Sequence, residues 1–243
     1  MISEDKPKIY YSFSETRSGR EAGQGAWRTG DNQPYPEDEG RGIRFGAYEL
    51  LQIAIAITVL TISFAIVFSR SSISSGGGFW IKMPAFLGAL PIVLVAVVTG
   101  FMLHELAHKF TAMHYGMWSE FRASGSGLVM TLVLALLAGI VFAAPGAVVI
   151  FGRPDKKENG IISAAGPLTN IFVSAIALAA LVLAPLSGYI ALIVYYMAFI
   201  NAFLALFNLI PIPPLDGSKV VKWNVATYVL MLAVSGFMVY HLW

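Results

Sequence analysis

Residues 92–110 read IVLVAVVTGFMLHELAHKF, an apolar run that ends in two histidines and a glutamate. A charged side chain at the centre of a membrane-spanning helix costs about 2.5–3.5 kcal/mol, so three ionisable residues within five positions need a chemical reason. On a helix, His104 and His108 are four residues apart and share one face, so both imidazoles can reach a single metal ion. Glu105 lies next to them and can accept a proton from an attacking water. The stretch therefore predicts a metal-dependent hydrolase site on a membrane helix.

The composition of the whole chain indicates an integral membrane protein. Of its 243 residues, 57% are hydrophobic and 12% are charged, and the mean hydropathy is +0.70. Several apolar runs of about 20 residues match the ~30 Å hydrocarbon core of a lipid bilayer. The net charge of +2, with basic residues scattered among the predicted loops, argues against a nucleic-acid partner. The chain has no Cys, so any metal must be held by His and carboxylate side chains.

The hydropathy pattern predicts an all-α polytopic membrane domain over residues 47–243, after a polar tail. The tail, residues 1–46, contains 7 Lys/Arg and 8 Asp/Glu and no apolar stretch, so we expect it to be disordered in the cytosol, or ordered only against a partner. The expected spanning helices cover about 47–69, 86–113, 161–184, 189–210 and 222–242.

The segment 127–151 has two interpretations. Residues 127–144 are apolar and just long enough to cross the membrane, but Pro145-Gly146 then forms a turn and 147–151 has a β-like pattern. The fold class is therefore five to six transmembrane helices, with 127–151 as either a sixth crossing or a membrane re-entrant, β-like hairpin.

A second cluster, residues 208–217, reads NLIPIPPLDG. Three prolines in four positions cannot continue a helix, so this backbone is non-helical near membrane depth, where it must be buried or line a wet cavity. A catalytic zinc takes three protein ligands and one open position, and two His with one carboxylate are a known set. Asp216 is the best candidate for the third ligand, because the other acidic residues after the first cluster all lie in predicted loops: Glu120, Asp155 and Glu158.

These motifs resemble the site-2 proteases, zinc metalloproteases that cut within the membrane. The matching residues are His104-Glu105-Leu106-Ala107-His108, then Gly166-Pro167 with Asn170, then Asn208-Leu209-Ile210-Pro211 through Leu215-Asp216-Gly217. The chain departs from the compact members of this family in its extra apolar stretch at 127–144.

The resemblance implies one Zn²⁺ per chain, held by His104, His108 and Asp216, with Glu105 as the general base. Asn208 matches a family asparagine near the zinc, where it helps to hold the substrate or the oxyanion. The implied activity is hydrolysis of a peptide bond in or near a transmembrane segment of a membrane-tethered protein, which releases a regulatory fragment.

This ligand set constrains the topology. Helices 86–113 and 189–210 must run in the same direction to bring their ends to one depth, which requires an odd number of crossings between them. We therefore expect 127–151 to be the re-entrant hairpin and 161–184 to be the one crossing. With five crossings, nine loop cations lie on one side and only Arg70 and Lys82 on the other. The positive-inside rule then places the N-terminus and the active site toward the cytosol of a cell-membrane protein.

A peptide bond inside a helix is shielded by hydrogen bonds, so the substrate must unwind before cleavage. An edge strand at about 147–151 would hold the unwound segment by strand addition.

Two other function classes remain open. Another membrane zinc hydrolase, which trims prenylated or misfolded membrane proteins, would share the two-His helix but lack the Leu215-Asp216-Gly217 ending. A catalytically silent scaffold or a metal transporter is the third class, and a transporter would carry ionisable groups on several helices.

Overall fold

The computed structural model describes residues 9–11, 45–69, 82–141 and 145–243. Within these residues, five helices are long and apolar enough to cross a membrane, which confirms the predicted all-α polytopic class. They are α1 (Ala47–Ser69), the continuous helix Met83–His114, α5 (Lys156–Leu183), α6 (Gly188–Asn208) and α8 (Val225–Leu242).

The second spanning helix changes its winding just before the histidines. It consists of α2 (Met83–Val97), a π-helical turn η2 (Val98–Met102) and α3 (Leu103–His114). Such wide turns often occur at functional sites. Gly100, in the π turn, lies close to α6, and a Cβ added there would be 2.9 Å from the Leu204 side chain.

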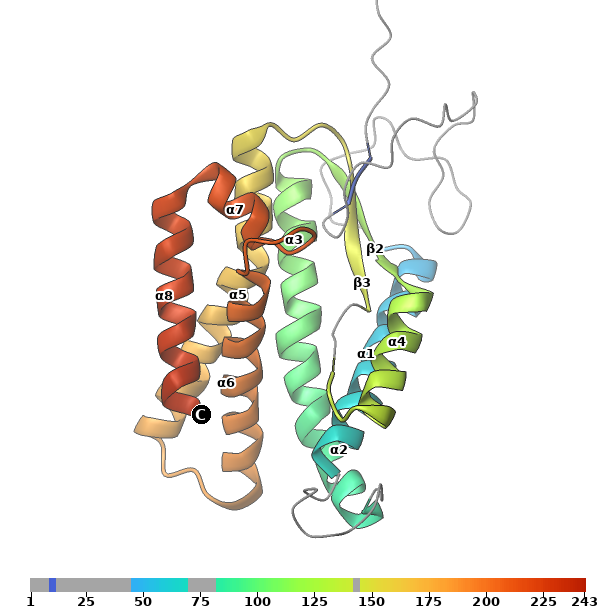
Figure 1. The fold of residues 1–243 in the computed structure, drawn as a ribbon, viewed down its shortest axis with the longest axis vertical. Helices are drawn as coiled ribbons and strands as arrows, with labels where there is room; N and C mark the ends of the chain where they lie inside the picture. The colour runs from blue at the N-terminus through green and yellow to red at the C-terminus, as the bar shows by residue number, and fades with distance from the viewer. Residues whose placement is uncertain (1–8, 12–44, 70–81, 142–144) are drawn as a thin grey trace, which may run out of the picture.

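The segment after α3 turns back on itself. It forms β2 (Trp118–Ala123), α4 (Gly125–Leu137) and β3 (Gly146–Phe151). The 13 residues of α4 span about 20 Å at 1.5 Å per residue, which is too short for the hydrocarbon core. In Figure 1, α4 descends beside α1 and β3 returns to the end where α4 began. The described residues of this segment therefore turn back as a hairpin would, and its re-entry into the membrane stays a prediction. The strand β2 before it was not predicted.

The sheet has three strands in the order β1-β3-β2, and both pairings are antiparallel. β1 is Ile9–Tyr11, a segment of the polar tail (Figure 1). The prediction that β3 is an edge strand is wrong, because β1 pairs with its second edge. The rest of the expected disordered tail, residues 1–8 and 12–44, lies outside the described residues.

The expected helix 222–242 is divided in two. α7 (Gly217–Trp223) ends at Asn224, and α8 begins directly after it. Asn224 has an extended conformation, and its side chain accepts a hydrogen bond from the Thr227 N–H at 2.9 Å, which caps α8. The capped Asn224 therefore separates α7 from α8, a division that the hydropathy pattern does not predict.

The topology satisfies the condition set by the two motifs. Helix α3 and helix α6 end at the same end of the molecule, and α5 is the one spanning helix between them in the described chain (Figure 1). The proline-rich segment after α6 lies beside α3, so the second motif meets the first.

Candidate active site

Three ionisable side chains from α3 and the start of α7 converge in the interior. The Nε2 atoms of His104 and His108 are 3.1 Å apart, and they lie 3.3 and 3.2 Å from Oδ2 of Asp216. All three residues are buried, with 5%, 1% and 4% of their surfaces exposed. In the described residues, this is the one group of three His or acidic side chains whose ligand atoms could hold a metal ion. The structure thus brings together the three residues named from the sequence.

Helix α5 fixes the orientation of both imidazoles. Nδ1 of His104 lies 2.6 Å from Oδ1 of Asn170, and Nδ1 of His108 lies 2.7 Å from the carbonyl oxygen of Ile162. Both partners are acceptors, so each Nδ1 carries the proton and each Nε2 keeps its lone pair. The free lone pairs therefore face the same point, as metal ligation requires.

The carboxyl group of Asp216 is held beside the two imidazoles by the segment that leads into α7. The backbone around Asp216 is closely packed, since a Cβ at Gly217 would collide with the Leu209 carbonyl oxygen. This packing explains why glycine follows the aspartate.

Glu105 lies beside the three-residue cluster and also contacts the sheet. Its Oε2 accepts a hydrogen bond from the Val148 N–H of β3 at 3.1 Å. A cavity between α1, α3, α6 and the start of β3 is lined by Glu105 and His104 together with Gly146 and Asn208. The predicted general base therefore borders a space that is open to both the cluster and the sheet.

Asn208 lies at the same cavity but makes a local contact. Its Nδ2 donates a hydrogen bond to the Leu204 carbonyl oxygen one turn earlier, at 3.0 Å. Among the described residues, the second N–H of this amide has no acceptor. Its part in substrate or oxyanion binding stays a prediction.

Comparisons with known proteins agree with this geometry. The sequence model of peptidase family M50 matches residues 183–229 of this chain, which include α6, Asp216 and α7. The chain is 37% identical over 199 residues to "Putative zinc metalloprotease MJ0611" of Methanocaldococcus jannaschii, which covers 81% of this chain and 96% of that protein. The chain belongs to peptidase family M50.

Two further relatives carry the same description at lower identity. YwhC of Bacillus subtilis is 29% identical over 157 residues, 56% of this M50 peptidase and 70% of its own length. Rip2 of Mycobacterium tuberculosis is 28% identical over 147 residues, 55% and 57% of the two chains. No solved structure matches the chain. The family and the five apolar helices together establish an intramembrane zinc metalloendopeptidase of the site-2 protease type.

The convergent side chains of the M50 peptidase fit zinc. Two neutral imidazoles and one carboxylate, all aimed at one point, are a ligand set that zinc takes in catalytic sites. Both imidazoles also have the partner at the second ring nitrogen that is usual for metal-bound histidines.

Gly166 explains how α5 of the M50 peptidase comes so close to the imidazoles. A Cβ added at this position would be 2.7 Å from Nε2 of His104 and would also collide with Nε2 of His108. Any side chain at 166 would therefore enter the space of the two ligand atoms.

One residue of the M50 site was missed in the sequence. Asn201, on α6, accepts a hydrogen bond from Nδ2 of Asn170 at 2.9 Å and donates to Oγ1 of Thr99 at 3.1 Å. Nδ2 of Asn170 also donates to the carbonyl oxygen of Gly100 at 2.7 Å. These contacts hold the Asn170 amide so that its oxygen faces His104. The available signal was an amide side chain within an otherwise apolar helix.

Proposed function

We propose that this M50 peptidase hydrolyses a peptide bond in or near a transmembrane segment of a membrane-tethered protein and thereby releases a regulatory fragment. The observation that carries the proposal is the buried cluster of His104, His108 and Asp216 beside Glu105 and an apolar cavity. A site buried among spanning helices favours a substrate that reaches it from within the bilayer.

In this proposal His104, His108 and Asp216 hold the zinc ion. When bound, zinc polarises the substrate carbonyl and activates a water for attack. Glu105 accepts a proton from the attacking water and returns it to the leaving amine. The hydrogen bond from Val148 keeps the Glu105 carboxylate at the cavity, while the free N–H of Asn208 stabilises the developing oxyanion.

β3 is flanked by β2 and by the described residues of β1, so an extended substrate segment would bind to β3 in place of β1. Gly146 of β3 lines the cavity, and the N–H of Val148 is bound to Glu105, so this strand leads directly to the general base. Backbone pairing with β3 would hold an unwound segment without demanding a particular side chain.

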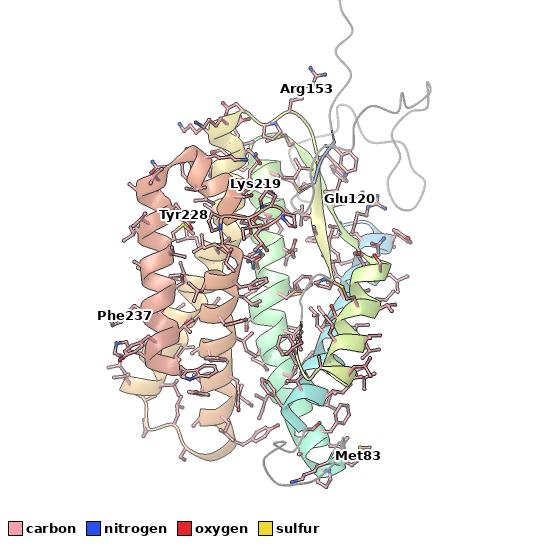
Figure 2. The ribbon with its side chains drawn as sticks, viewed as in Figure 1. Met83, Glu120, Arg153, Lys219, Tyr228 and Phe237 are labelled. Carbon is pink, nitrogen blue, oxygen red and sulfur yellow. The ribbon has the colours of Figure 1, made fainter. Side chains whose placement is uncertain are left out.

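The charge distribution supports a cytosolic active site. Arg153, Lys156, Lys157 and Lys222 lie at the end of the molecule where α5 begins and α7 ends. Figure 2 places Arg153 at this end and Met83, next to Lys82, at the opposite end. The positive-inside rule then assigns the first end to the cytosol.

The test is cleavage of a membrane-tethered substrate by purified protein in lipid vesicles. Glu105→Gln should retain zinc and lose cleavage by about 10²–10⁴-fold, the usual contribution of a general base. The matched control is Glu39→Gln, the same chemical change in the polar tail, which should cleave at the wild-type rate. Unchanged cleavage by Glu105→Gln would refute the general-base role.

A further inference from the structure

The outer edge of β2 is closed by side chains from α1. Oε1 of Glu49 accepts a hydrogen bond from the Phe121 N–H at 2.8 Å, and Oε1 of Gln52 accepts one from the Ala123 N–H at 2.6 Å. Nζ of Lys109 donates to the carbonyl oxygen of Ser119 on the same strand at 2.7 Å. The backbone groups that would pair with an added strand are thus already bound, so an extended ligand cannot join the sheet here.

On the opposite side, the edge of β3 contacts Glu105, the proposed general base. In an antiparallel pair, the backbone groups of successive residues alternate between the two edges. Phe121 is opposite Val148 and directs its N–H away from β3, so Val148 directs its own N–H away from β2. That N–H is bound to Glu105. Ile150, two residues further on, presents its backbone to the same edge.

The protein's own tail occupies this edge. In β1, Ile9 is opposite Phe151, Tyr10 is opposite Ile150 and Tyr11 is opposite Val149. The chain of β1 therefore advances along β3 toward Val148, and the last described pair lies one residue short of the position held by Glu105. Isoleucine and tyrosine are among the residues that favour strands.

We propose that β1 occupies the substrate-binding edge of β3, so that the N-terminal tail competes with the extended segment of the substrate. This inference rests on the proposed function, because it needs a substrate that pairs with β3. In the described part of the chain three residue pairs hold β1, and the outer edge of β2 offers no alternative site for either strand. The tail is thus a displaceable competitor that lowers the apparent affinity for the substrate and leaves the chemical step intact.

Disulfide formation tests the position of β1 without any need for activity. The 243-residue chain has no Cys, so Tyr11→Cys with Val149→Cys introduces the only two thiols in it. Their Cα atoms, in a pair without mutual hydrogen bonds, should be about 4.5 Å apart, within the range of disulfides. We expect rapid oxidation of this pair, also in a Glu105→Gln background. The matched control, Tyr11→Cys with Ala147→Cys, is two residues out of register and should oxidise slowly. Equal rates for the two pairs, or no disulfide in either, would overturn the placement.

Kinetics then test the competition. Tyr10→Pro removes the N–H that faces Ile150 and should weaken β1, so KM for a membrane-tethered substrate should fall several-fold at unchanged kcat. Ser14→Pro, outside β1, is the control and should match the wild type. Cleavage with an unchanged KM in Tyr10→Pro would overturn the competition alone. Absence of cleavage in every chain, including the wild type, would instead overturn the proposed function, while the disulfide result would still report on the strand.

Discussion

Oδ1 of Asn170 lies 2.6 Å from Nδ1 of His104, although the two residues are 66 positions apart and belong to different spanning helices. The contact links the Gly166-Pro167…Asn170 motif to the first histidine of the HELAH motif. It sets which nitrogen of the imidazole carries the proton, and so it prepares the other nitrogen for metal. Three predictions about the metal site start from this arrangement.

Replacement of Asn170 should weaken zinc binding without removing a ligand. In Asn170→Leu, Nδ1 of His104 loses its acceptor and the imidazole can rotate, so zinc affinity should fall about 10–100-fold. The measurement is zinc loss to a competing chelator. Asn201→Leu should show a smaller loss in the same assay, because Asn201 acts only by holding the Asn170 amide. Wild-type affinity in Asn170→Leu would contradict the orienting role.

Asn208 should behave differently from Asn201, although both are asparagines on α6. Asn208 does not contact a proposed ligand, so Asn208→Ala should keep its zinc. Its cleavage rate should fall by about 10²-fold, the typical effect of a lost oxyanion donor. Zinc content and kcat measured on the same preparation separate these effects. A drop in zinc with unchanged kcat per bound zinc would argue for a structural role instead.

Gly166→Ala should abolish zinc binding, because the added methyl group would lie against both Nε2 atoms. Gly88→Ala is the matched control on a spanning helix, since a Cβ there meets no atom within 4 Å. Metal analysis of the two purified variants gives the comparison. Full zinc occupancy in Gly166→Ala would mean that α5 lies farther from the imidazoles than described.

The Lys109–Glu49 ion pair should be a major contribution to stability. Nζ of Lys109 is 2.8 and 2.9 Å from the two carboxylate oxygens of Glu49, and both side chains are buried. Lys109→Met would leave a buried carboxylate unpaired, so the free energy of unfolding should fall by about 3–5 kcal/mol. Unfolding by denaturing detergent measures this loss. The double variant Lys109→Met/Glu49→Gln should recover part of it; no difference between single and double variants would show that the pair does not couple.

The spanning helices and the two halves of the candidate site could be predicted because their signals are local. Apolar runs mark the helices, and the spacing of His104 and His108 defines a shared helix face. The ligand set of Asp216 with the two histidines came from zinc chemistry and the family resemblance, and it set the direction of the helices, because the ends of α3 and α6 had to lie at one depth.

Other features depend on contacts between residues that are far apart in the sequence, and local sequence patterns do not predict such contacts. The strand β2 includes Glu120 and Arg122 and forms only because β3, beyond α4, pairs with it. The role of Asn201 depends on its hydrogen bond with Asn170, which lies on another helix. The pairing of β1 with β3 joins residues about 140 positions apart. The polar composition of the tail did not predict a strand there.

The most direct test of the account is the zinc content per chain of the purified protein and of Asp216→Ala. Asp155→Asn is the control, because Asn also serves as an N-cap and the site is exposed at the start of α5. We expect one zinc in the wild type and in the control, with marked loss in Asp216→Ala. Full zinc occupancy in Asp216→Ala would contradict this expectation, because the third ligand would then lie outside the cluster that joins α3 to the segment after α6.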